Sequence, residues 1–376
     1  MNNLDLLIQL VEQNSHSYSK AGVDAVGAIV ESELPFMKTT RYRHESMGDL
    51  LVFTSEEQVE GEDKIILSGH SDTVFPPDTE FKVIQKGDKL HGPGTQDMKA
   101  GLVTIIRVLQ KLHKEGKLKN ITFTLIPDEE AGTKAHLDVL LNEVYPQFEI
   151  GLVFESSTEY NDNGAFLPMK RTLVTERKGG GLAFFDVTSK GGHAGVLTQR
   201  KDRISSVEEA CYIALELEKL ANYDEGTTLN PGKICGGIAG NVIAYECKLE
   251  ADYRVVTVEE EQRIVNALNT IAETPYRDGT STKLTLKFNR PPMVPTKRTP
   301  ELVELAQNVA NALNMEIVTE KRGGFSDGND ISSKGVTVLD GFGPHGNGEH
   351  SLDEFVYLSA IQPSIDYSYE FLTTLL

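Results

Sequence analysis

The sequence predicts a mixed α/β fold with two domains, in which a larger domain with a mostly parallel sheet is interrupted by a smaller α+β domain. Three observations support this prediction. The chain has 376 residues, which is long for a single hydrophobic core. Strand-like and helix-like segments alternate in its first half, as expected for a parallel sheet that helices cover on both faces. The order of segments changes near Glu176, and the first pattern returns after Arg290.

Short apolar runs in the first half are expected to be buried strands. They lie at residues 50–53, 65–67, 121–126 and 150–154. Residues 99–113 instead carry apolar side chains three and four positions apart, which indicates an amphipathic helix. Candidate site residues occur both before and after the central region, so we assign residues 1–176 and 291–376 to one domain.

Residues 177–290 are expected to form the smaller domain. Its predicted elements are a strand at 182–188, a helix at 206–220, strands at 233–238 and 244–256, a helix at 257–272 and a strand at 283–288. Ser206 with Glu209, and Thr257 with Glu260, have the spacing of capping boxes that begin the two helices. The order β-α-β-β-α-β is that of the ferredoxin-like motif.

The composition excludes several classes of partner. The formal net charge is −19, whereas nucleic acids and anionic membranes are bound by clustered Lys and Arg. No segment approaches the ~20 apolar residues of a membrane-spanning helix. Residues 1–19 contain no Lys or Arg, unlike a secretory signal, so we expect a cytoplasmic protein. Cys211, Cys235 and Cys247 are few and widely spaced, which predicts reduced thiols.

Two motifs in the first half carry candidate metal ligands. His70 follows the apolar run at 65–67, and Asp72 is placed to accept the second ring proton of a metal-bound imidazole. The alternative is a loop histidine beside a solvated aspartate. Asp97 follows a Gly-Pro-Gly turn and directly precedes the helix. Asp97 is either a helix cap or a carboxylate that bridges two metal ions.

Further carboxylates follow the next two predicted strands. Asp128, Glu129 and Glu130 are consecutive, and their mutual repulsion is costly unless a cation offsets it. One glutamate of this turn can bind metal while its neighbour acts as a general base; the alternative is a solvated acidic turn. Glu155 follows the run at 150–154 and should reach the same edge of the sheet, unless it is only an exposed strand end.

A late glycine-rich segment supplies two more imidazoles, His345 and His350. With one of these, the chain offers two histidines and three carboxylates, enough to hold two divalent cations about 3.5–4 Å apart. Local spacing alone does not decide between the two histidines. A choice between them depends on similarity to known proteins.

Taken together, these motifs resemble the zinc aminoacylase and carboxypeptidase family. The motifs are Gly-His-x-Asp-Thr-Val at 69–74, Gly-Pro-Gly-x-x-Asp-Met-Lys-Ala-Gly at 92–101, Asp-Glu-Glu-x-Gly at 128–132, Glu155, Gly-His-Ala-Gly at 192–195 and His-Ser at 350–351. The resemblance covers nearly the whole chain. The family includes succinyl-diaminopimelate desuccinylases, tripeptide aminopeptidases and glutamate carboxypeptidases, and the motifs are most similar to those of the last group.

The resemblance implies a set of metal ligands. Asp97 would bridge two zinc ions, His70 and Glu155 would hold one of them, and Glu130 with His350 would hold the other. The donor set would also accept Co²⁺ or Mn²⁺.

Other roles are implied in the same way. Glu129 would be the general base, and Asp72 would orient the imidazole of His70. The domain at 177–290 would act as a lid and dimerisation domain, and its His193 would reach the partner subunit's active site and stabilise the oxyanion. From the residues alone, His193 is an ordinary member of a glycine-rich loop.

Four residues are expected on the substrate side. Asn241 ends a segment similar to the family's Gly-x-x-x-Asn, and Arg254 stands in an Asp-x-Arg whose arginine would hold a substrate carboxylate. The alternative for Arg254 is a pair with a neighbouring acid. Arg322 and Gly324 belong to a turn like the family's Arg-Gly-Gly-x-Asp-Gly, with one extra residue before the aspartate. For Arg322 the alternative is a surface arginine.

These observations predict a binuclear zinc hydrolase, and the resemblance implies that it is a homodimer. Its substrates would be N-acyl amino acids, or peptides with a free and acidic C-terminal residue, cleaved at the amide bond. A di- or tripeptide aminopeptidase of the same family is the alternative. A catalytically silent relative that only binds small molecules or peptides is disfavoured, because every presumed ligand and the base are present.

Overall fold

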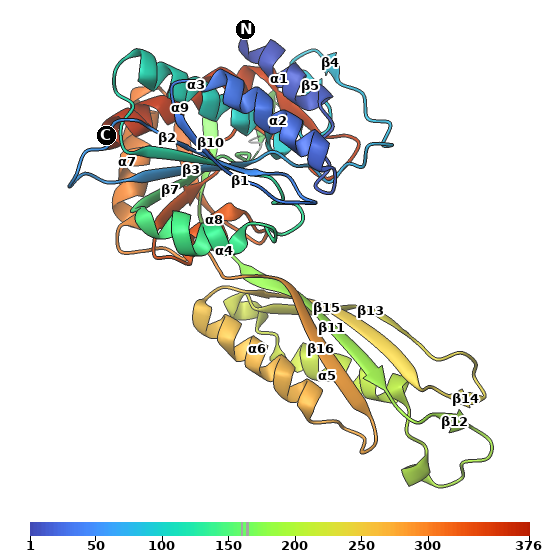
Figure 1. Cartoon of the computed structure of the whole chain (residues 1–376). Coiled ribbons are helices and arrows are strands. Elements are labelled where there is room, and N and C mark those ends of the chain that lie inside the picture. Colours follow the sequence, from blue (N-terminus) through green and yellow to red (C-terminus); the bar gives the residue numbers. More distant parts are fainter. Residues whose placement is uncertain (159–160, 163–164) are drawn as a thin grey trace. The chain divides into compact units, whose positions relative to one another are not determined.

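The protein divides into two compact units in a computed structural model that describes residues 1–158, 161–162 and 165–376 (Figure 1). The larger unit consists of Met1–Glu176, Pro295–Arg322 and Ser326–Leu376. The smaller unit consists of Arg177–Val294 and Gly323–Phe325. Each unit has its own hydrophobic core.

An eight-stranded mixed sheet organises the larger unit. Its spatial order is β1 (Lys38–Tyr42), β2 (Leu50–Thr54), β6 (Ile121–Ile126), β3 (Ile65–His70), β7 (Ile150–Val153), β18 (Thr337–Asp340), β10 (Lys170–Arg177) and β17 (Glu316–Arg322). The central neighbours β6–β3, β3–β7 and β7–β18 are parallel. The pairs β1–β2, β2–β6 and β10–β18 are antiparallel. The predicted α/β class with a parallel central sheet is confirmed.

Helices cover both faces of this sheet, with α1, α2, α3 and α9 on one side and α4 and α8 on the other (Figure 1). Their bounds are α1 (Asn3–Glu12), α2 (Lys20–Glu33), α3 (Ala100–Lys114), α4 (Leu137–Val139), α7 (Thr299–Ala312), α8 (Asp327–Ser332) and α9 (Leu358–Leu375). Strands β3 and β6 are buried at every residue. Burial on both faces explains why these strands read as continuous apolar runs without alternation.

A second sheet connects distant parts of the larger unit. It runs β19 (Gly346–Asn347), β20 (Phe355–Tyr357), β5 (Lys89–His91) and β4 (Ile84–Lys86), so the segment before Asp97 lies beside the segment that carries His350. The remaining short elements are η1 (Thr95–Lys99), η2 (Leu140–Val144), η3 (Tyr145–Gln147), β8 (Asn161–Asp162) and β9 (Ala165–Phe166).

The smaller unit is an antiparallel four-stranded sheet with two helices. The sheet order is β13 (Thr228–Gly236), β15 (Glu246–Val255), β11 (Gly179–Thr188) and β16 (Ser281–Arg290), and the helices are α5 (Ser206–Leu220) and α6 (Val258–Glu273). The short strands β12 (Gly192–His193) and β14 (Val242–Ile243) pair with each other, and η4 (Arg200–Asp202) and η5 (Tyr223–Glu225) lie in loops. This element order and this sheet order are those of the ferredoxin-like motif.

The start of α5 differs from the prediction by one residue. Its N-cap is Ser205, whose side chain accepts from the N–H of Glu208. Ser206 is the first helical residue and is buried, and the Glu209 carboxylate accepts from the N–H groups of Tyr276 and Arg277. Ser205 and Ser206 both fit the capping pattern in the sequence. Glu209 does not cap the helix, because its carboxylate is the acceptor for the N–H groups of the 276–277 turn.

At α6 the Thr257 half of the predicted capping box is confirmed, because its side chain accepts from the N–H of Glu260. The Glu260 carboxylate instead accepts from Thr227 and Arg263.

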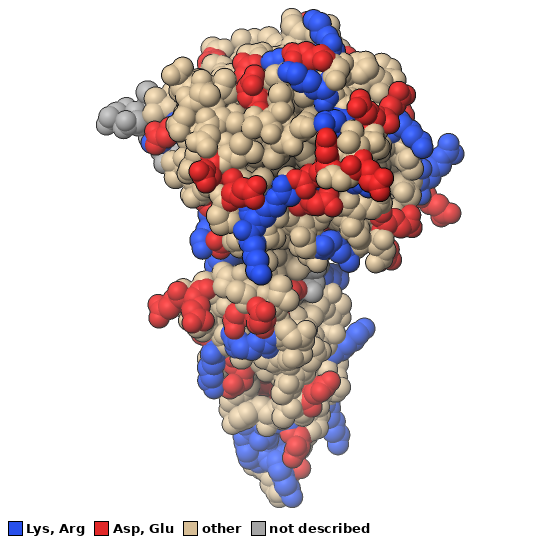
Figure 2. All heavy atoms as spheres, turned by 90° about the vertical axis from the view of Figure 1, so that its left-hand side faces the viewer, with Lys and Arg blue, Asp and Glu red and all other residues tan. Residues whose placement is uncertain are grey.

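The charged side chains on the surface and the apolar character of the helices can be compared with the expectations from composition. On the face shown in Figure 2, acidic and basic side chains are interspersed on the larger unit. Among the described residues, no helix combines the length and the apolar character needed to cross a membrane.

Candidate metal and active site

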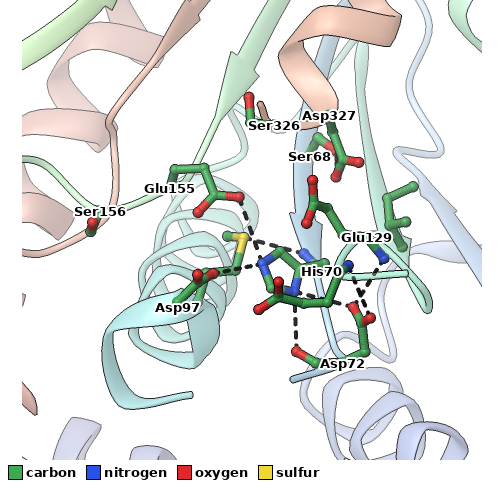
Figure 3. A network of polar contacts seen from close by, with 12 residues as sticks. Ser68, His70, Asp72, Asp97, Glu129, Glu155, Ser156, Ser326 and Asp327 are labelled. Atoms are coloured by element: carbon green, nitrogen blue, oxygen red, sulfur yellow. Dashed lines mark hydrogen bonds and ion pairs between the residues drawn. The ribbon is translucent and has the colours of Figure 1, made fainter. Parts of the chain in front are cut away.

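Three parallel neighbours in the sheet bring four predicted site residues to one edge. His70 is the last residue of β3, which lies between β6 and β7. Glu129 and Glu130 follow β6, and Glu155 follows β7. Because parallel strands end at the same edge, the side chains converge there, as Figure 3 shows for His70, Glu129 and Glu155.

Asp97 lies between the two histidines. One carboxylate oxygen, Oδ1, is 2.9 Å from His70 Nε2, and the other, Oδ2, is 3.4 Å from His350 Nε2. Glu155 Oε1 lies 3.6 Å from His70 Nε2, and Glu130 Oε2 lies 3.0 Å from His350 Nε2. The carboxylate of Asp97 thus faces both imidazoles, and α3 has no side-chain hydrogen bond at its N-cap. The bridging role of Asp97 stays a prediction.

The donor atoms form two groups that share Asp97. His70, Asp97 and Glu155 place one ligand atom each within 4.8 Å of one another, and so do Asp97, Glu130 and His350. Each group offers an imidazole and two carboxylates, a donor set that divalent transition metals accept. The residues present therefore fit two metal ions, one in each group.

The charges of the site also fit a bound cation. Burial and the negative charge of Asp97 raise the pKa of Glu130 to about 8 and the pKa of Glu155 well above its usual value. Hydrogen bonds with Asp97 and Glu130 raise the pKa of His350 to about 11. Three carboxylates crowded in a buried space repel one another, and a cation would relieve this repulsion.

Asp72 connects His70 to the glutamate turn. The carboxylate is fully buried, and its Oδ1 is 3.2 Å from His70 Nδ1. Its two oxygens accept from the N–H groups of Glu129 and Glu130, each at 3.1 Å, and from Ser17 Oγ at 2.6 Å. Asp72 therefore orients the imidazole and positions the backbone of the turn in one network (Figure 3).

The surroundings of His345 differ from those of His350. Its ring is fully buried, and Nε2 lies 2.9 Å from the carbonyl oxygen of Lys170. Burial and the nearby charge of Arg171 lower the pKa of His345 to about 3. His345 belongs to neither ligand group, whereas His350 does.

The smaller unit brings two other predicted residues together. His193 in β12 pairs with Val242 in β14, and the carbonyl of Asn241 accepts from the N–H of Ala194 at 3.0 Å. His193 and Asn241 are both exposed. The Nδ1 atom of His193 accepts from the N–H of Gly195 at 3.1 Å, and this contact orients the ring.

The two arginines predicted to bind substrate make contacts within the protein. Arg254 donates to both oxygens of Asp252, and its guanidinium lies 4.0 Å from the centre of the Phe325 ring. The contact with Asp252 is the pair with a neighbouring acid that the sequence left as the alternative. Arg322 donates to the carbonyl of Ser156 at 2.9 Å and to Thr158 Oγ1 at 2.6 Å, and so contacts the segment after Glu155. The carbonyl of Gly324 accepts from Arg177 at 3.0 Å. The substrate roles of these residues stay predictions.

Two buried charges near Asp97 were not recognised in the sequence. The Glu354 carboxylate accepts from three backbone N–H groups of the loop that carries Asp97. The Lys99 ammonium is buried and donates to the carbonyl of Gln13 at 2.9 Å, and burial lowers its pKa to about 7. Glu354 lies four residues after His350 in a non-helical segment, and no local pattern indicated its contact with the Asp97 loop.

A mixed α/β unit with two carboxylate–histidine groups at the carboxyl edge of its sheet is typical of a metal-dependent hydrolase. A family model described as peptidase family M20/M25/M40 matches residues 66–374, and the chain belongs to this metallopeptidase family. The protein is therefore a hydrolase.

Individual relatives agree with this assignment. The chain is 26% identical over 370 residues to carboxypeptidase G2 from Pseudomonas sp. (strain RS-16), covering 94% of this chain and 85% of that protein. It is 26% identical over 342 residues to a probable succinyl-diaminopimelate desuccinylase from Staphylococcus aureus, covering 80% and 82%. A solved tripeptidase from Staphylococcus aureus is similar with a TM-score of 0.77 at 22% identity, over 99% of this chain and 97% of that one, which supports the fold.

Proposed function

We propose that the protein is a two-metal hydrolase that cleaves the amide bond of N-acyl amino acids, or of peptides with a free and acidic C-terminal residue. The observation that carries this proposal is the pair of ligand groups that share the Asp97 carboxylate. A carboxylate shared by the two groups would allow two ions to bind close together, as in two-metal hydrolytic sites. Zn²⁺ is the proposed metal, since imidazole and carboxylate donors suit it.

The bound ions would polarise the scissile carbonyl and supply a nucleophilic water near neutral pH. Glu129 belongs to neither ligand group, yet it adjoins Glu130 and lies beside His70 (Figure 3). Its carboxylate would take the proton of the attacking water and pass it to the nitrogen of the leaving amine. Asp72 supports this role because it holds the N–H of Glu129 at 3.1 Å.

The smaller unit would complete the site as a lid. The exposed His193 would donate its ring N–H to the developing oxyanion in the partner subunit of a homodimer. Its Nδ1 already accepts from Gly195, which leaves Nε2 as the donor. The exposed loop around Asn241 would contact the substrate beside it.

The similarity to carboxypeptidase G2 supports the proposal that the substrate carries a free carboxylate. Arg254 and Arg322 would supply a guanidinium for this carboxylate, at the cost of their contacts with Asp252 and Thr158. An aminopeptidase acting on di- or tripeptides is the second candidate, because the ligand groups alone serve both reactions. Small-molecule or peptide substrates in the cytoplasm are proposed in either case.

The test is amino-acid release from N-acyl-glutamate, N-acyl-aspartate and N-acyl-leucine, and from unblocked dipeptides. Each substrate is assayed with chelator-treated protein and with the same protein after addition of Zn²⁺, Co²⁺ or Mn²⁺. Metal-dependent cleavage of only the blocked acidic substrates supports the proposal. Cleavage of only the unblocked peptides assigns the protein as an aminopeptidase, and no cleavage with any metal contradicts the catalytic proposal.

A further inference from the structure

The loop that carries Asp97 is attached to one buried carboxylate. Glu354 Oε1 accepts from the N–H groups of Gln96 at 2.8 Å and Asp97 at 3.1 Å, and Oε2 accepts from the N–H of Gly94 at 3.0 Å. The Glu354 side chain is fully buried, so water does not compete for these three donors. A single side chain therefore satisfies three N–H groups of this turn.

This turn satisfies only some of its own N–H groups. The N–H groups of Thr95 and Lys99 donate to the carbonyls of Gly92 and Gly94, whereas three others donate to Glu354. Gly94 has a left-handed conformation, with φ of 76°, and Asp97 has φ of −116° and ψ of 94°, which is not helical. Regular i→i−4 hydrogen bonds are consequently interrupted just where the presumed bridging ligand stands. Buried N–H groups require an acceptor, and in this loop Glu354 supplies it from 257 to 260 positions away in the sequence.

The same segment also supplies a ligand. His350 lies four residues before Glu354, and its Nε2 lies 3.0 Å from Glu130 Oε2 and 3.4 Å from Asp97 Oδ2. The main-chain carbonyl of Glu354 further accepts from the N–H of Gly92 at 3.4 Å. The segment from His350 to Glu354 thus contacts the Asp97 loop through its backbone and through its ligand.

We propose that Glu354 is a positioning residue. It holds the Asp97 loop in the conformation that binds metal before any metal ion arrives, and it keeps the Asp97 carboxylate next to the His350 ring. This inference rests on the proposed metal binding, but the hydrogen bonds between Glu354 and the loop are made within the chain itself. The hydrogen bonds of the Glu354 carboxylate are to the backbone of the loop, so Glu354 acts through the position of Asp97.

Two variants and a matched control test this role. Glu354→Ala removes all three acceptor bonds, and Glu354→Gln keeps one carbonyl oxygen that can still accept from Gln96 and Asp97. The control is Asp353→Asn, which changes an exposed carboxylate on the adjacent residue. The first measurement is hydrogen–deuterium exchange of the 94–99 segment in chelator-treated protein, followed by mass spectrometry. The second is the affinity of each protein for Zn²⁺, measured by competition with a chelator.

We expect fast exchange of this segment in Glu354→Ala, intermediate exchange in Glu354→Gln, and wild-type exchange in the control. Metal affinity should fall by about 10–100-fold for Ala and by less for Gln, as for other residues that orient ligands. Wild-type exchange and affinity in a folded Glu354→Ala would overturn the inference. If Ala does not fold, equal exchange and affinity in Glu354→Gln and wild type overturn it. Absence of Zn²⁺ binding to wild type would instead contradict the proposed function, and the exchange result would still decide the conformational role of Glu354.

Discussion

The two units differ in how they present most of their predicted functional residues. In the larger unit, the side chains of His70, Asp97 and Glu155 are 1%, 15% and 13% exposed and their polar atoms lie against one another. His350, whose side chain is 54% exposed, is the exception among the five proposed ligands. In the smaller unit, His193 and Asn241 lie on exposed loops. The first group is assembled by strand ends and buried hydrogen bonds, whereas the second is held mainly by backbone pairing between β12 and β14.

This difference separates two tasks of the proposed enzyme. A ligand cluster must be organised before the metal arrives, and rigid strand ends provide that organisation. A group that stabilises the transition state in a closed site must remain accessible until closure. The comparison predicts that changes in the larger unit alter metal binding or proton transfer, while changes in the smaller unit alter turnover alone.

The largest effect is expected for Glu129→Gln. This variant keeps the shape of the side chain but cannot take a proton, so kcat should fall by about 10²–10⁴-fold. Metal content should stay at the wild-type value, because Glu129 lies outside both ligand groups. Steady-state kinetics and elemental analysis measure the two quantities, with the exposed Glu143→Gln as control. Loss of metal would identify Glu129 as a ligand, and retained activity would place the base elsewhere.

The next effect is expected for His193→Ala. Loss of an oxyanion donor should lower kcat by about 10²–10³-fold without loss of metal. Thr198→Ala, an exposed change in the same loop, is the control. An unchanged kcat in His193→Ala would remove this residue from the site.

A mixture of variants tests whether His193 acts on its partner. Co-expressed Glu129→Gln and His193→Ala should form heterodimers in which one of the two sites contains both functional residues. About a quarter of the wild-type activity should then return. Activity no higher than that of the separate variants would show that His193 serves its own subunit.

Metal binding should stabilise the larger unit and not the smaller one. All five proposed ligands belong to the larger unit, and each unit has its own core, so two calorimetric transitions are expected. An ion at about 100 times its Kd adds about 2.7 kcal/mol to the unit that binds it. Asp97→Asn should remove most of this gain. An equal shift of both transitions on addition of Zn²⁺ would contradict the assignment of the ligands to one unit.

The sequence predicted site residues well where they directly follow a strand that is itself recognisable as an apolar run. His70, Glu130 and Glu155 stand at the ends of apolar runs, and parallel strands bring such ends together whatever the rest of the chain does. His350 and His345 share one glycine-rich segment, so local spacing could not show which ring turns toward Glu130. That choice depends on the long-range contact between His350 and Glu130, 220 positions apart.

Other features were beyond the reach of local patterns. The acceptors of the Asp97 loop come from Glu354, and nothing near residue 97 indicates that distant partner. Arg254 matched a substrate-binding motif, yet its guanidinium pairs with Asp252, two residues away. An Asp-x-Arg on one face of a strand allows both arrangements, and the neighbouring side chains decide between them.

The smallest effect is expected from surface ion pairs, which should stabilise only the unit that contains them. Asp63 accepts from Arg298 Nη1 at 2.8 Å in the larger unit, and this hydrogen bond lowers the pKa of Asp63. Glu260 accepts from Arg263 Nε at 2.7 Å in the smaller unit, and its pKa is lowered as well. Both pairs are partly exposed, so each is worth about 0.2–1 kcal/mol.

A carboxylate with a depressed folded-state pKa stabilises the protein above its unfolded pKa, and this stability is lost as the pH falls through the folded value. Asp63→Asn should therefore lower the transition of the larger unit at pH 7, and Glu260→Gln should lower that of the smaller unit. Each difference from wild type should shrink toward the acid end of a calorimetric pH series. A change in the other unit's transition, or a difference that grows in acid, would show that the two units are energetically coupled through more than the chain that joins them.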